Sequence, residues 1–207
     1  MRPILFNTDM VRAILSGSKT VTRRICRDAN KLTVPLSDTI DHNARTYTVE
    51  GINEDGITQY LAERRMPYAA GDILWVRETW AKAAPDIYAC KTDNDRQVPR
   101  WHPSIHMPKE AARLFLRVTD VRLERLREIS EEQAQREGIR LQHEDFIPAY
   151  HYRKAELPGD GWKTAGSAFA ALWNSTVRPQ ESGRYGWDAN PWVWVIEFER
   201  MKEEDTR

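Results

Sequence analysis

A short basic segment near the amino terminus carries residue types suited to chemistry. Residues 17–24 read Gly-Ser-Lys-Thr-Val-Thr-Arg-Arg, and residues 1–31 hold seven basic and two acidic side chains, a local balance of +5. Such a cluster can hold phosphate, for which Arg is the better bidentate partner. Thr and Val favour a strand here. In that strand Thr22 and Arg24 point to one side, and Lys19 and Arg23 point to the other. By composition alone, a solvated basic face is the favoured alternative.

A carboxylate near a helix end is a candidate partner for this lysine. The pattern Ser-Glu-Glu-Gln at 130–133 predicts a capped helix that ends at Gly138. Glu137 then lies in the last turn, where the helix dipole disfavours a negative charge by about 0.3–1 kcal/mol unless a cation is near. If Lys19 and Glu137 met in a cleft, they would form a candidate acid–base pair. A plain surface glutamate is the alternative.

An aromatic strand supplies candidate base-binding side chains. Residues 75–80 read Trp-Val-Arg-Glu-Thr-Trp and follow a Gly-Asp turn. Trp75 and Arg77 share one face of an extended strand, and Trp and Arg planes stack on bases with about 1–3 kcal/mol per base. The chain has eight Trp in 207 residues. Most of them must lie in the core, so burial of Trp75 and Trp80 is the alternative.

A histidine pair lies in a loop bounded by prolines. His102 and His106 are four residues apart, but Pro103 opposes the helix that would align them. No Cys or carboxylate stands at metal-ligand spacing with them. We therefore expect these histidines to hydrogen-bond within the loop, or to line the mouth of a pocket, rather than to bind a metal.

A mixed set of strands and helices must position these residues. Residue patterning predicts strands at 3–6, 20–24, 47–52, 57–61, 73–78, 114–126 and 192–198, and helices at 8–16, 130–138 and 164–173. The alternation of the long strand slips near residues 119–120, which predicts a bulge or bend. Regular helical crossovers are missing, which argues against a doubly wound parallel sheet. We predict an α+β fold, a small mixed β-barrel with helices packed at its ends.

The chain is expected to form one domain over residues 1–200. Polar segments at about 28–70, 81–112 and 141–163 are predicted to be loop insertions, and 201–207 is a charged tail.

Composition excludes several protein classes. The 31 Lys and Arg balance 31 Asp and Glu, which argues against coating nucleic acid by bulk electrostatics. No stretch approaches the roughly 18 apolar residues of a membrane helix. Two cysteines do not make a disulfide framework, so we expect free thiols and a cytoplasmic location. No Gly-rich phosphate loop appears, and no cofactor is expected.

Taken in order, these pieces resemble the ASCH domain family of the PUA-like superfamily. The family pattern is Gly-x-Lys-Thr-x-Thr-x-Arg after an early helix, a Gly-Asp-x-Leu strand, a long strand, a short helix ending Glu-Gly, and a closing Val-Ile-Glu-Phe strand. The chain is similar to this pattern at 17–24, 71–74, 114–126, 137–138 and 195–198. More narrowly, 75–80, 103–108 and 187–192 look like the branch common in phages and prophages.

The resemblance implies a PUA-like β-barrel with a cleft that binds RNA or a modified nucleoside. One branch hydrolyses the amide of N4-acylated cytidines, and its catalytic residues fall by motif on Lys19, Thr22 and Glu137. In that scheme Thr22 would attack the acyl carbonyl, Lys19 would accept its proton or stabilise the oxyanion, and Glu137 would assist proton transfer. The residues expected to bind the substrate or nucleic acid are Arg23, Arg24, Trp75, Arg77, Glu78, Trp80, Ser104 and His106.

Several functions stay open from the sequence. Nucleobase binding and amide hydrolysis stand close to even. A ribonuclease would use Lys19, Arg24 and Glu137 for phosphoryl chemistry, and a phage-type protein-interaction factor would use the insertions. The chain is about twice as long as the hydrolytic branch, and Arg23 adds a bulky cation beside Thr22. Matching residue types therefore do not guarantee the same reaction.

Overall fold

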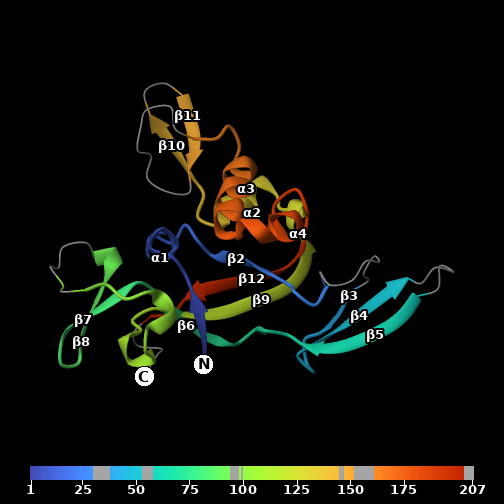
Figure 1. Ribbon diagram of the computed structural model, residues 1–207, viewed down its shortest axis with the longest axis horizontal. Helices are drawn as coiled ribbons and strands as arrows, with labels where there is room; N and C mark the ends of the chain where they lie inside the picture. The colour runs from blue at the N-terminus through green and yellow to red at the C-terminus, as the bar shows by residue number, and fades with distance from the viewer. Residues whose placement is uncertain are drawn as a thin grey trace.

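The protein is a mixed α+β fold in the computed structural model, which describes residues 1–29, 38–52, 58–93, 98, 100–144, 147–151 and 161–202. The strands are β1 (Arg2–Leu5), β2 (Val21–Ile25), β3 (Asp38–Asp41), β4 (Thr46–Ile52), β5 (Thr58–Arg65), β6 (Ile73–Arg77), β7 (Trp80–Ala84), β8 (Ile87–Cys90), β9 (Phe115–Arg125), β10 (Arg140–Glu144), β11 (Ile147–His151) and β12 (Trp192–Arg200). The helices are α1 (Thr8–Leu15), α2 (Glu131–Arg136), α3 (Ala165–Thr176) and α4 (Ser182–Tyr185). Figure 1 shows how these elements are arranged.

A five-stranded sheet is the centre of the fold. Its order is β1-β6-β9-β12-β2, with β1 parallel to β6 and the other pairs antiparallel. The long strand β9 pairs with both β6 and β12. Its register against β12 shifts between Glu197 and Phe198, which leaves Thr119 as the extra residue. The bulge predicted from the slipped alternation is therefore confirmed.

Helices α2, α3 and α4 lie together on one side of β2, β12 and β9 (Figure 1). The core on this side joins apolar residues of β2 and β12, such as Val21, Val193 and Val195, to Phe169 and Trp173 of α3. Both α2 and α3 begin with a capping box, on Ser130 and Thr164. The other side of the sheet holds a second core, which includes Ile4, Phe6, Trp194, Ile196 and residues of α1.

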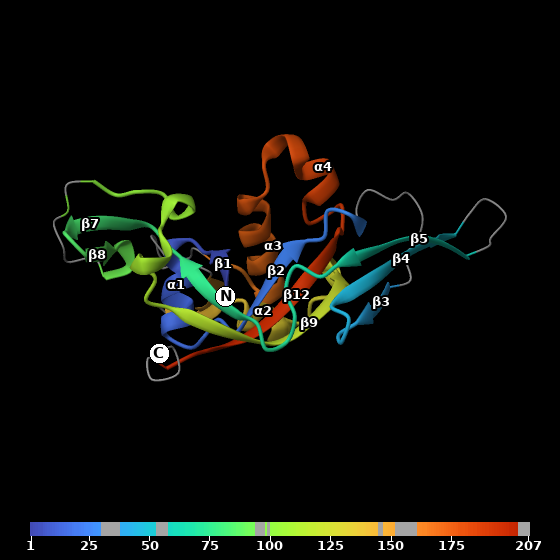
Figure 2. The same cartoon turned by 90° about the horizontal axis from the view of Figure 1, so that it is seen from below.

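Each of the three predicted insertions contains a small sheet of its own. Strands β3, β4 and β5 form an antiparallel sheet, and β7 with β8 and β10 with β11 form hairpins. The hairpin predicted from 47–52 and 57–61 is confirmed as β4 and β5, and its turn lies outside the described residues. The sheet β3–β5 and the hairpin β7–β8 extend from opposite ends of the molecule (Figure 2).

The predicted α+β class is confirmed, and the closed barrel is not among the sheets of the described residues. The five-stranded sheet is open, with β1 at one edge and β2 at the other. The regions 81–112 and 141–163 contain strands where loops were expected. Most of the predicted charged tail lies outside the described residues. No helix in the described part of the chain is long and apolar enough to cross a membrane.

Candidate functional site

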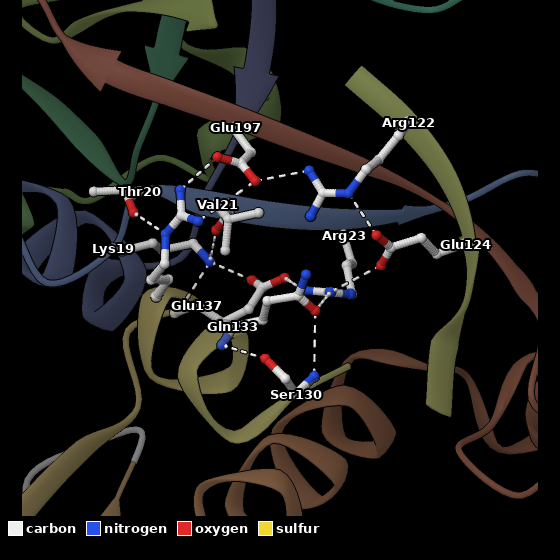
Figure 3. Close-up of polar contacts among 11 residues, drawn as sticks. Lys19, Thr20, Val21, Arg23, Arg122, Glu124, Ser130, Gln133, Glu137 and Glu197 are labelled. Carbon is white, nitrogen blue, oxygen red and sulfur yellow. Dashed lines mark hydrogen bonds and ion pairs between the residues drawn. The ribbon is translucent and has the colours of Figure 1, made fainter. Parts of the chain in front are cut away.

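Lys19 and Glu137 meet in a buried ion pair (Figure 3). Lys19 Nζ donates to Glu137 Oε2 at 2.6 Å, to the Glu137 carbonyl at 2.9 Å and to the Val21 carbonyl at 2.9 Å. The lysine side chain is 0% exposed and the glutamate side chain 3%. Three acceptors use all three N–H donors of an ammonium group, so the geometry fits a protonated Lys19 beside an ionised Glu137.

Local structure fixes both partners. Gly17 follows α1 with φ +77°, a conformation that glycine adopts without strain, and this turn leads directly to Lys19. Glu137 is the C-cap of α2, and its backbone forms a β-bridge with Lys19. The next residue, Gly138, has φ +99°, and a Cβ there would lie 2.9 Å from the Ala13 Cβ. Close packing of α1 on the end of α2 therefore brings the lysine to the carboxylate.

Arg23 is a second buried cation on the same carboxylate. Its Nη1 donates to Glu137 Oε1 at 3.2 Å, and its Nη2 donates to Glu124 and to Gln133. The Arg23 side chain is completely buried. The helix-dipole argument requires a cation near Glu137, and Lys19 and Arg23 both meet this requirement. The polar network continues across the sheet through Arg122, Glu197, Arg136 and Thr20 (Figure 3).

Burial is the main influence on the proton affinity of Lys19. Desolvation lowers its pKa from the ordinary value, and the charges of Arg24 and Arg23 lower it further. The contacts with Glu137 oppose this shift. Glu137 therefore raises the pKa of Lys19 against the combined effect of burial and the two arginines.

Thr22 lies on the other face of β2. It pairs with Ile196, and Arg24 pairs with Trp194. Its side chain is buried, and within the described residues its hydroxyl has no hydrogen bond to Lys19 or Glu137. The structure thus brings Lys19 and Glu137 together and places Thr22 on the opposite face from Arg23, as the alternation predicted.

Arg24 connects the buried pair to an open cleft. Its Nη2 donates to the Leu5 carbonyl at 2.7 Å, and its guanidinium lies 5.1 Å from the ring centroid of Phe6. Lys19 Nζ lies 5.8 Å from the same ring. Burial lowers the pKa of Arg24, while the charge of Glu137 and the phenol of Tyr68 oppose this shift. Arg24 is therefore within electrostatic reach of both the carboxylate and the cleft.

The cleft runs along the end of β2 and has a volume of about 390 Å³. Its rings are Tyr47, Tyr68 and Trp194, and Tyr47 packs edge-on against Trp194 with 4.8 Å between ring centroids. The other lining residues are Arg24, Ile25, Cys26, Arg27, Asp28, Arg65 and Pro67. Sequence reasoning did not select the two tyrosines, because they lie in a polar segment interpreted as an insertion.

Trp75, Arg77 and Glu78 take structural positions. Trp75 is 7% exposed and lies under the Arg77 guanidinium, 4.8 Å from its ring centroid. Glu78 is 1% exposed and accepts hydrogen bonds from Arg113 and Thr92. The alternative of a core tryptophan therefore holds for Trp75.

Trp80, Ser104 and His106 belong to the same outlying part of the chain. The Trp80 ring packs on Tyr88 and His102, at 5.8 and 5.1 Å between centroids. Ser104 and His106 lie in a short 3-10 turn, and His106 is exposed. Within the described residues, no hydrogen bond or ion pair joins these side chains to the Lys19–Glu137 pair. The structure therefore separates Trp80, Ser104 and His106 from the predicted site residues around Lys19 and Glu137.

Among the described residues, no three His, Cys, Asp or Glu side chains gather as metal ligands. Comparison with models of protein families, with curated proteins and with solved structures finds no match to this chain.

Proposed function

We propose that the protein binds a nucleobase, of RNA or of a modified nucleoside, in the cleft beside β2. The observation that carries this proposal is the lining of the cleft, where the half-buried ring of Tyr68 and the guanidinium of Arg24 lie together. Tyr47 and Trp194, each 4% exposed, form the core behind them. A volume of about 390 Å³ is within the range of small-molecule sites, roughly 300–1,000 Å³. Stacking of a base on an aromatic ring contributes about 1–3 kcal/mol, and Tyr68 is a half-buried ring on this cleft.

The charge of the cleft supports a ligand that carries oxygen atoms or phosphate. Among the described residues, Arg24, Arg27 and Arg65 line it together with Asp28, and Glu181 pairs with Arg27 at 3.4 Å. Arginine recognises phosphate and carbonyl oxygens through paired N–H donors. The protein as a whole is neutral, so this local excess of positive charge favours a short or single-nucleotide ligand over a long polymer.

We further propose that the sheet is a PUA-like arrangement of the ASCH type. The side chain of Arg24, in edge strand β2, reaches the Leu5 carbonyl in edge strand β1. This hydrogen bond links the two edge strands of the sheet, which a barrel arrangement brings close together. The buried Lys, the Glu-Gly helix end and the order of the strands agree with the motif pattern of the family.

Binding is tested with cytidine, N4-acetylcytidine, cytidine monophosphate and a short single-stranded RNA, by calorimetry at about 50 mM salt. We expect the Tyr68→Ala variant to lose about 5- to 100-fold in affinity, because one stacking ring is removed. Tyr88→Ala is the matched control, since Tyr88 is also half-buried but packs on Trp80 in the β7–β8 hairpin. If none of these probes binds, or if both variants lose affinity equally, the proposed site is wrong.

Amide hydrolysis of an N4-acylcytidine is a second candidate, favoured by one observation. A fully buried lysine with a lowered pKa, paired with a carboxylate, is typical of acid–base sites. Incubation with N4-acetylcytidine would then release cytidine and acetate, with water as the second reactant. Thr22→Val keeps the shape of the side chain and removes the hydroxyl, so it should abolish turnover if Thr22 is the nucleophile. Unchanged turnover in this variant would remove Thr22 from the mechanism.

A further inference from the structure

The backbone of β2 has one edge that the sheet does not use. In the ladder with β12, Arg24 lies opposite Trp194 and Thr22 lies opposite Ile196. Beyond the two ends of this ladder, Cys26 N donates to the Trp192 carbonyl, and Phe198 N donates to the Thr20 carbonyl. In an antiparallel pair, alternate residues direct both backbone groups to the partner strand. The backbone N–H and C=O groups of even-numbered residues of β2 therefore point toward β12. Those of odd-numbered residues point away from β12, along the free edge of the strand.

A side-chain contact confirms this assignment independently. The Val21 carbonyl accepts a hydrogen bond from Lys19 Nζ at 2.9 Å, so it points away from β12. The same alternation directs the N–H and C=O groups of Arg23 and Ile25 to this free edge. Within the described residues, neither backbone pair has a hydrogen-bond partner. Ile25 is also a lining residue of the cleft, so the free edge of β2 borders the proposed ligand site.

We propose that the main chain of Ile25 reads the edge of the bound base. Its N–H would donate to a ring nitrogen or carbonyl, and its C=O would accept from an adjacent N–H on the base. This inference rests on the proposed nucleobase site and deepens it. The ligand class is a base with neighbouring acceptor and donor atoms, such as N3 and the exocyclic N–H of cytosine, or N1 and the exocyclic N–H of adenine.

A planar base fits this edge better than a peptide strand. The Val21 carbonyl already accepts a hydrogen bond from Lys19 Nζ. Within the described part of β2, Arg23 and Ile25 are then the two residues whose backbone groups remain unpaired on the free edge. Strand addition requires a longer run of unpaired groups. The half-buried ring of Tyr68 on the cleft favours a flat ring over an extended main chain.

The direct test replaces the Ile25 amide with an ester, by incorporating the α-hydroxy analogue of isoleucine. This change removes the Ile25 N–H, which is not part of the β2–β12 ladder, and turns the Arg24 carbonyl, which faces β12, into a weaker ester acceptor. The comparison of parent and deaza compounds in the same ester protein cancels any general loss of stability or affinity from that weaker acceptor. The ligand is changed in parallel: 3-deazacytidine lacks the acceptor N3 of cytidine, and 1-deazaadenosine lacks the acceptor N1 of adenosine. With the unmodified protein, we expect the deaza compound to bind about 5- to 50-fold more weakly than its parent nucleoside. With the ester protein, parent and deaza compounds should bind equally.

The outcomes separate this inference from the proposed function. If neither cytidine nor adenosine binds the unmodified protein, the nucleobase site itself is wrong. If a parent nucleoside binds, but the ester leaves its preference over the deaza compound unchanged, the Ile25 contact is wrong and the site stands. Should the ester protein not fold, amide NMR of the unmodified protein decides. Binding should shift the Ile25 amide more than that of Cys26, which donates within the sheet, and equal shifts would overturn the inference.

Discussion

Neutralising Glu137 tests whether this carboxylate is what holds two cations in the interior. Its two oxygens accept from Lys19 and Arg23, whose side chains are both 0% exposed. In Glu137→Gln, Lys19 keeps two carbonyl acceptors, and Arg23 keeps Glu124 and Gln133. Breaking a buried ion pair by removing one partner costs about 3–5 kcal/mol. This is a large part of the roughly 5–15 kcal/mol by which a whole domain is stable.

The ability of Lys19 to lose its proton sets an upper limit on how much unfolding free energy its unpaired charge can cost in Glu137→Gln. Instead of staying charged without a counter-ion, Lys19 can release its proton. The ordinary pKa of lysine, 10.5, lies about 3.5 units above pH 7, so deprotonation at pH 7 costs about 4.8 kcal/mol. We therefore expect Glu137→Gln to lower the free energy of unfolding by about 3–5 kcal/mol at pH 7.

The stability that Glu137→Gln loses relative to the wild type should decrease as the pH rises. Glu137 opposes the burial that lowers the pKa of Lys19, so the variant lowers this pKa further. Between that pKa and 10.5, the unfolded chain binds more protons than the folded protein. Stability therefore rises with pH, by up to about 1.4 kcal/mol per pH unit. The difference in unfolding free energy between variant and wild type should narrow with rising pH over the interval between the lower Lys19 pKa of the variant and the Lys19 pKa of the wild type.

Urea unfolding measures the difference in unfolding free energy between Glu137→Gln and the wild type. Tryptophan fluorescence and far-UV circular dichroism follow the same transition as two probes. Glu124→Gln is the matched control, because Glu124 also contacts two arginines but is 19% exposed. We expect the control to lose about 1 kcal/mol, as partly solvated ion pairs do. Equal losses in the two variants, or a loss below about 1 kcal/mol for Glu137→Gln, would refute the account of a buried ionised carboxylate.

Three further predictions concern the surroundings of the site. Burial raises the pKa of Cys90 to about 12, so a thiol reagent at pH 8 should label it about 1000-fold more slowly in the native protein than in urea, as followed by peptide mass spectrometry. Glu131 accepts from the first two backbone amides of α3 at 2.7 and 3.0 Å, so Glu131→Ala should cost about 1–2 kcal/mol in urea unfolding. Gly138→Ala should destabilise more than Gly17→Ala in thermal unfolding; both have positive φ, but only at Gly138 would the new Cβ meet another atom, Ala13 Cβ at 2.9 Å.

The secondary structure was largely readable because its signals are local. The capping box at Ser130, the strand over 192–198 and the bulge near Thr119 each depend on neighbouring residues, and each is confirmed. The small sheets in 81–112 and 141–163 were missed, since short polar strands give weak alternation. A closed barrel depends on how distant edges meet, which no local pattern determines.

The chemistry of the site was readable only in part. Lys19 and Glu137 are 118 residues apart, and the dipole argument indicated that Glu137 needs a cation without showing which one. For Trp75 and Glu78, residue type did not distinguish a buried structural role from a base-binding role, because both residue types occur in both roles. In the structure Trp75 is 7% and Glu78 1% exposed, and burial is a property of the folded chain.

The electrostatics of the site link its two candidate functions. Glu137 pairs with Lys19 and Arg23 and acts through its charge on Arg24, while Glu124 pairs with Arg23 and Arg122. Arg24 also lines the cleft, and it lies beside the completely buried side chains of Lys19 and Arg23, where low solvent access strengthens the field of their charges. Such a field favours a ligand oxygen in the ground state. It would favour the greater charge of an oxyanion still more. A binding site built in this way therefore needs only a positioned nucleophile to become a hydrolytic one, and the Thr22→Val experiment tests that difference.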